Sequence, residues 1–187
     1  SDIIEKLADI NERTDSVFLL RDSIDIIRTV CGRFLNYLLA EALFKPCGQK
    51  KLDLIRVRYT ALLSRLSELL RFNSDFSLYA SLKELENTAP VNPRFADTLK
   101  NNICNDYCRQ CCSELIDFLF IGEADAVFEW AKTRGDKSVP KKKAKEIEKA
   151  FSDTPLEKMQ RPPIGTLPDA MRGIAREMRS LDEVFRI

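Results

Sequence analysis

The chain of 187 residues carries 30 basic and 29 acidic residues, and 44% of its residues are hydrophobic. This composition excludes a globally disordered chain, because it supplies enough apolar side chains for a folded core. The net charge of +1 does not by itself require a polyanionic partner. No segment reaches the roughly 18 uninterrupted apolar residues of a membrane span, and no signal-peptide pattern opens the chain. We therefore expect no membrane partner.

The residue types favour helices over strands. The chain has six glycines, few β-branched runs and abundant Leu, Ala, Glu, Lys and Arg. Residues 1–131 hold 16 basic and 20 acidic residues, a net charge of −4, whereas residues 132–187 hold 14 and 9, a net charge of +5. We predict an all-α fold with two parts: a multi-helix bundle over residues 1–131, and a basic, proline-punctuated arm over residues 132–187 that ends in an amphipathic helix.

The first half of the chain shows helical periodicity with clear breaks. The longest apolar pattern covers residues 16–44, and its apolar positions predict a central helix that is buried on more than one side. Pro46 and Gly48 are expected to end it. Residues 51–72 have the most regular spacing, which favours an antiparallel neighbour in a bundle over a coiled-coil seam. Shorter helices are predicted over residues 2–12 and 75–86.

Four of the six cysteines fall within nine residues. Cys104, Cys108, Cys111 and Cys112 stand at positions i, i+4, i+7 and i+8, which places them along one stripe of a helix. We predict this helix over residues 93–121, with Asn92 as its N-cap, Pro93 at its first position and Gly122 placed to end it. Because a free cysteine behaves as a small buried hydrophobe, the stripe is interpreted as a core face.

The cysteines allow two other interpretations. The first three have the spacing that holds an iron–sulfur cluster in radical-SAM enzymes, and four thiolates can bind a structural metal. However, Gln110 stands where those enzymes usually have an aromatic residue, no run of strands is predicted, and one helical stripe cannot surround an ion. We predict no metal and no cofactor. Clustered free thiols fit a reducing intracellular compartment, cytoplasmic or nuclear.

The sequence lacks most catalytic residue patterns. It has no histidine, which removes the commonest general base and every Ser–His or Cys–His pair. Its glycines lie singly, so no phosphate-binding loop is present. The carboxylate pairs Asp22/Asp25 and Asp106/Glu114 are more typical of a solvated helix face than of acid–base catalysis. We therefore predict that the protein is not an enzyme and assign no catalytic residue.

The basic part of the chain follows a predicted helix over residues 123–133. A lysine cluster there could contact phosphates in a salt-sensitive, sequence-independent way. Against this, Glu146 and Glu148 stand at distances where they could pair with lysines of the same helix, and Trp130 alone makes no stacking platform for bases. The candidate phosphate-binding residues are Lys137, Lys141, Lys142, Lys143 and Lys145.

The predicted helix over residues 169–185 has an apolar stripe that could bind a partner. Methionines suit adaptable interfaces, and an amphipathic helix can dock into a groove. The alternative is that the stripe packs on the bundle of its own chain. The candidate partner-binding residues are Met171, Ile174, Met178, Leu181 and Phe185.

These patterns together predict a non-enzymatic protein–protein interaction or scaffold module, within a larger protein or assembly. Its partner would be another protein or a second copy of itself. The alternative prediction is a helical protein that binds nucleic acid through residues 137–149.

Overall fold

We describe a computed structural model of the chain that covers all residues except 46, 89–93, 105–111, 137, 182–183 and 185–187. Every regular element among the described residues is helical, which confirms the all-α class. The elements are α1 (Asp2–Asn11), α2 (Val17–Phe44), α3 (Gln49–Leu70), the 3₁₀ turn η1 (Ser74–Phe76), α4 (Leu78–Thr88), α5 (Phe95–Cys104), α6 (Ser113–Leu115), the π-helical turn η2 (Ile116–Phe120), α7 (Ile121–Thr133), α8 (Ser138–Asp153), α9 (Leu156–Met159) and α10 (Leu167–Ser180).

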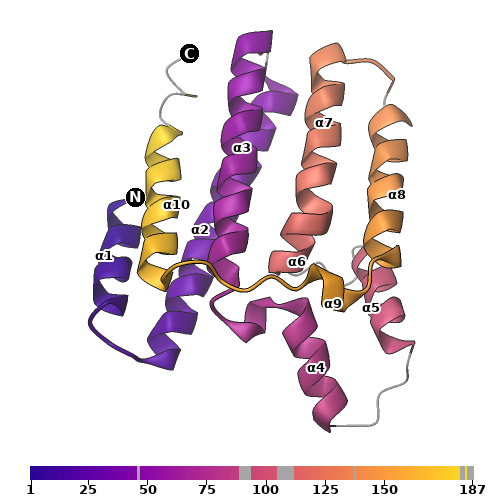
Figure 1. Ribbon diagram of the computed structural model, residues 1–187. Helices are drawn as coiled ribbons and strands as arrows, with labels where there is room; N and C mark the ends of the chain where they lie inside the picture. Colours follow the sequence, from indigo (N-terminus) through magenta and orange to yellow (C-terminus); the bar gives the residue numbers. More distant parts are fainter. Residues whose placement is uncertain (46, 89–93, 105–111, 137, 182–183, 185–187) are drawn as a thin grey trace.

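Figure 1 shows one layer of helices side by side, in the order α1, α10, α3, α7 and α8, while α2 lies behind α3. The shorter helices α4 and α5 lie below this layer. Helix α3 contacts α2, α10, α7 and the α6–η2 turn. It is therefore α3, rather than α2, that occupies the centre of the bundle.

Helix α2 begins and ends where the sequence predicts. The Ser16 hydroxyl accepts a hydrogen bond from the backbone N–H of Leu19 at 3.3 Å, which caps the helix N-terminus. Helix α2 packs mainly against α3 and also contacts α1 and α7, so more than one helix covers it. Phe18, in its first turn, is 80% exposed. The core residues of α2 line one side of the helix. They are Ile24, Ile27, Cys31, Leu35, Leu38 and Ala42.

Helix α10 packs back on the bundle of its own chain, between α1 and α3. Thr166 caps its N-terminus by accepting a hydrogen bond from the N–H of Asp169 at 3.3 Å. Towards α1, Arg172 of α10 pairs with Asp9 at 2.8 Å and with Glu12 at 2.6 Å. Both acidic residues lie at the C-terminal end of α1. Its apolar stripe is thus part of the core.

The predicted continuous helix over residues 93–121 is wrong. Helix α5 ends at Cys104, and Cys112 has an extended backbone (φ −107°, ψ 156°) before the chain turns into α6. Gly122 does not end a helix either, because it lies inside α7. A Cβ atom there would lie 3.1 Å from Cδ1 of Ile147, so the glycine allows α7 and α8 to pack closely.

The core consists of two hydrophobic clusters that meet at η2. One cluster gathers residues of α1, α2, α3, α7 and α10, and the other gathers residues of α4, α5, α6, α8 and α9. Ile116 belongs to the first cluster, Leu119 belongs to the second, and Phe120 packs against both. A π-helical turn inserts one residue into the helical repeat. Here it lies where consecutive residues of the chain pack into two different hydrophobic clusters.

Candidate functional site

Helix α2 presents a second regular stripe of residues to solvent, which we call the outer face. At 3.6 residues per turn this stripe lies roughly 140° around the helix from the buried side. Its members alternate at spacings of four and three residues, the spacing of a coiled-coil seam. The outer face consists of Ile26, Val30, Arg33, Tyr37, Ala40 and Phe44.

The outer face is apolar and accessible. Ile26 and Tyr37 are each 49% exposed, and Phe44 is 84% exposed. Val30 and Ala40 are half-buried at the same stripe, and Arg33 is exposed near its middle. Aligned large apolar side chains in solvent are typical of a protein-binding surface, whereas single scattered ones are not.

One end of the outer face is ordered by charges. Lys45 pairs with the buried carboxylate of Glu41, and the Lys45 ammonium also lies 5.8 Å from the centre of the Tyr37 ring. The hydrogen bond from Lys45 lowers the pKa of Glu41 below its ordinary value, and a hydrogen bond from Tyr37 acts in the same direction. Tyr37 is thus held in place before any partner arrives.

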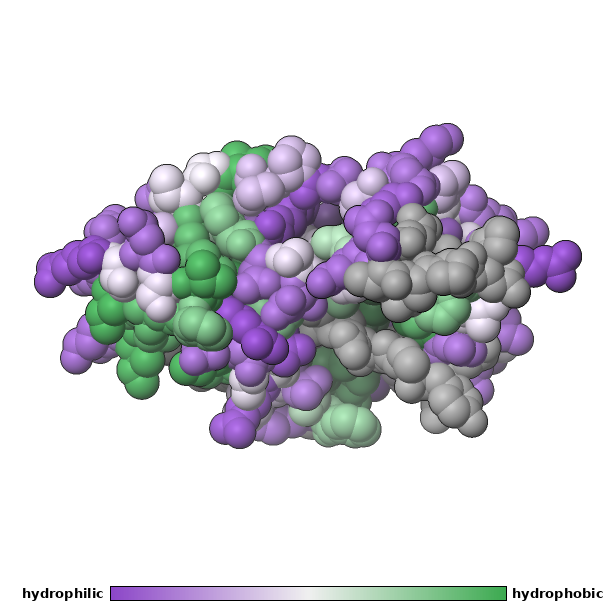
Figure 2. Space-filling model, turned by 90° about the horizontal axis from the view of Figure 1, so that it is seen from below, coloured by the Kyte–Doolittle hydropathy of each residue, from purple (hydrophilic) through white to green (hydrophobic). Residues whose placement is uncertain are grey.

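A second apolar surface lies where α2 begins, at the corner next to α1. Val17 and Phe18 are 70% and 80% exposed, and with Leu20 and Phe72 they line an open pocket of about 360 Å³. Figure 2 shows apolar side chains gathered on this end of the molecule. The pocket rim is polar, and Arg21 pairs across it with Asp75 at 2.9 Å.

The candidate phosphate-binding lysines lie on α8. Lys141, Lys142, Lys143 and Lys145 are all exposed, while Lys137 lies outside the described residues. In the described part of the chain, these four side chains form no ion pair with Glu146 or Glu148. The structure therefore brings the four lysines together on one accessible helix.

The candidate partner-binding stripe of α10 is placed differently. Met171 and Ile174 are fully buried, and Met178 and Leu181 are 6% and 1% exposed. All four belong to the core cluster shared with α1, α2 and α3. Phe185 lies outside the described residues. In this structure the stripe leaves little side-chain surface for a partner.

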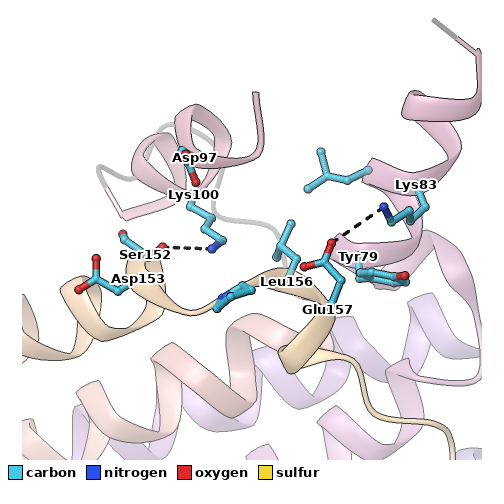
Figure 3. Close-up of a pocket in the computed structure, with 10 residues that line it drawn as sticks. Tyr79, Lys83, Asp97, Lys100, Ser152, Asp153, Leu156 and Glu157 are labelled. Atoms are coloured by element: carbon cyan, nitrogen blue, oxygen red, sulfur yellow. Dashed lines mark hydrogen bonds and ion pairs between the residues drawn. The ribbon is translucent and has the colours of Figure 1, made fainter. Parts of the chain in front are cut away.

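Figure 3 shows a polar pocket of about 270 Å³ between α4, α5 and the link from α8 to α9. Tyr79 and Lys83 come from α4, and Lys83 pairs with Glu157 of α9 at 3.9 Å. Asp97 and Asp153 line the opposite side. Acidic and basic groups are both present, so the pocket has no single charge that would select an anionic or a cationic ligand.

Lys100 reaches into this region from α5 and is only 3% exposed. Its ammonium group donates hydrogen bonds to the carbonyl oxygens of Ser152, at 3.1 Å, and Thr154. These acceptors lie at the C-terminal end of α8, where a helix leaves carbonyls without partners. Burial lowers the pKa of Lys100. The contacts make Lys100 a cap that ties α5 to α8.

Two carboxylates near η2 are structural, and sequence patterns did not single out their roles. Buried Glu114 accepts hydrogen bonds from the Ser77 hydroxyl at 2.6 Å and from the N–H groups of Leu78 and Tyr79, so it caps α4. Asp117 pairs with Arg71 at 2.6 Å. Both partners are distant in sequence, so helical spacing alone carries no signal for them.

The described residues include only two of the four clustered cysteines. Cys104 is half-buried and Cys112 is buried, in agreement with a core role, whereas Cys108 and Cys111 lie outside the described residues. Among the described residues, no group of three or more candidate ligands could hold a metal ion. Asp106, the other member of the Asp106/Glu114 pair, also lies outside them, whereas Glu114 is 3% exposed and so does not lie on the solvated helix face that the sequence predicts.

No protein-family model matches the chain, and comparisons with curated proteins and with solved structures gave no match. Among the described residues, no helix combines the length and apolar character needed to cross a bilayer.

Proposed function

We propose that the chain is a non-enzymatic helical interaction or scaffold module, and that the outer face of α2 is its docking surface. The observation that carries this proposal is the alignment of Ile26, Tyr37 and Phe44 on one exposed stripe. Transferring a large apolar side chain from water to an apolar contact contributes about 1.5–3 kcal/mol. Phe44, at 84% exposure, has most of that free energy still to gain.

The proposal is tested by affinity capture from an extract of the cells that make the protein. The bait variant is Tyr37→Glu with Phe44→Glu, and its matched control is Phe18→Glu with Val57→Glu, because these apolar residues are also exposed but lie off the outer face. We expect the outer-face variant to lose proteins that the wild type and the control retain. Equal capture by all three baits would contradict the proposal.

A second candidate function is nucleic-acid binding through α8. The observation that favours it is that Lys141, Lys142 and Lys145 are exposed and form no ion pair with described carboxylates. Lysines in this state can each release a counterion from a phosphate backbone. The test is retention on a polyanion column after Lys141, Lys142, Lys143 and Lys145 are all changed to Glu. Unchanged retention would exclude this function.

A further inference from the structure

The outer face of α2 is arranged symmetrically about Leu35. Ile26 and Phe44 stand nine residues to either side of it, and the inner members of the stripe follow the same rule. When two such helices lie antiparallel, each residue meets the one at the same distance on the other side. The pairs are then Ile26 with Phe44, Val30 with Ala40, and Arg33 with Tyr37.

We propose that a second copy of this chain occupies the outer face, with the two α2 helices antiparallel about a two-fold axis near Leu35. This inference rests on the proposed function and names its partner. A two-fold interface uses the same patch on both copies, so the patch must be complementary to itself. The alternation of four- and three-residue spacings also suits the left-handed crossing of paired helices.

The chemistry of the pairs favours the antiparallel arrangement over the parallel one. The pairs farther from the axis, Ile26 with Phe44 and Val30 with Ala40, join apolar side chains. In the pair next to the axis, Arg33 of each copy lies over the Tyr37 ring of the other copy and forms a cation–π contact. A parallel pair would instead place Arg33 against Arg33 of the partner copy, which repels. Antiparallel helices also bring opposite ends of their dipoles together.

Phe34, which is 37% exposed and flanks the stripe next to the axis, would lie on the same side of the helix pair as Phe34 of the second copy.

The outer face is short, so we expect a weak dimer. From Ile26 to Phe44 the outer face spans about 27 Å at 1.5 Å per residue. One helix pair of this length supplies less than the roughly 800 Å² per partner of a stable complex. The dimer should therefore be reversible and depend on protein concentration.

A charge exchange across one pair of residues tests the arrangement. Light scattering of the full chain measures the association constant of wild type, Ile26→Lys and Phe44→Glu, and then of an equal mixture of the two variants. We expect a concentration-dependent dimer for wild type and at least a tenfold weaker association for each variant alone. The mixture should recover dimers, since the lysine introduced in one copy then meets the glutamate introduced in the other. The second pair at the opposite end of the helices keeps its native Ile26 and Phe44.

Matched controls are Val57→Lys and Phe18→Glu, which place the same charges on exposed residues off the stripe and should associate like wild type. If either variant fails to fold, Arg33→Glu replaces it, because Arg33 is exposed and its substitution should also weaken association. A monomeric wild type, variants that dimerise unchanged, or a mixture that does not recover would overturn the inference. A monomeric wild type whose outer-face variant still loses captured proteins would leave the proposed function standing without the second copy.

Discussion

Glu114 shows how a single buried carboxylate can fix the position of a helix. Its two oxygens accept hydrogen bonds from the Ser77 hydroxyl and from the backbone N–H groups of Leu78 and Tyr79. These N–H groups belong to the first turn of α4, which lacks helical acceptors for them. The carboxylate therefore joins α4 to α6 at the edge of the second core cluster.

The change Glu114→Ala should destabilise the fold by about 2–3 kcal/mol, because it leaves buried donors without their charged acceptor. The measurement is the midpoint and slope of urea unfolding. Glu146→Ala is the control, since Glu146 is an exposed glutamate on α8 and its loss should change the midpoint little. A Glu114→Ala midpoint equal to that of the control would show that the cap is dispensable.

Lys100 gives a prediction for the dependence of stability on pH. Burial lowers its pKa in the folded protein below the ordinary value of 10.5. Between the lowered pKa and 10.5 the unfolded chain binds more protons than the folded one, so the Lys100 contribution to stability rises with pH in that window.

The comparison is between wild type and Lys100→Met, with the free energy of unfolding measured in steps from neutral pH upward. The difference between wild type and variant should shift in favour of wild type as pH rises, while the titration of other groups cancels. A difference that stays flat, or that shifts towards the variant, would show that Lys100 keeps its proton in the folded state.

At the scale of elements, periodicity predicted the helices better than it predicted what surrounds them. Helices α1, α2 and α3 lie within a few residues of the predicted ranges, because their repeats are long and their breaks contain proline, glycine or capping residues. The break at Cys112 was missed, since cysteine has no strong preference that would mark a helix end. Gly122 was wrongly predicted to end a helix. Its lack of a side chain instead allows α7 to pack closely against Ile147 of α8.

The burial of α10 predicts that it is indispensable to the fold. Ile174 is fully buried among residues of α1 and α3, whereas Ile164, of the same type, is 74% exposed in the link before α10. Ile174→Ala should cost about 2–5 kcal/mol, and Ile164→Ala should cost almost nothing. Thermal or urea unfolding of both variants measures this, and equal midpoints would contradict the packing of α10 on the bundle.

At the scale of the whole molecule, the surfaces were the least predictable feature. Both faces of α2 are apolar in sequence, and periodicity cannot tell a face covered by a neighbour from one left in solvent. Only the order of the helices decides that α3 covers Ile24 and Leu38 while Ile26 and Phe44 stay exposed. The stripe of α10, predicted as a candidate surface, occupies the core for the same reason.

Association through the outer face of α2 is tested most directly by side-chain footprinting of the full chain at two protein concentrations, above and below the dimer midpoint. Tyr37 and Phe44 should lose reactivity with the labelling reagent at the higher concentration. Phe18, similarly exposed but off the stripe, should keep its reactivity. Unchanged labelling of Tyr37 and Phe44, or protection of Phe18 instead, would contradict self-association through the outer face of α2.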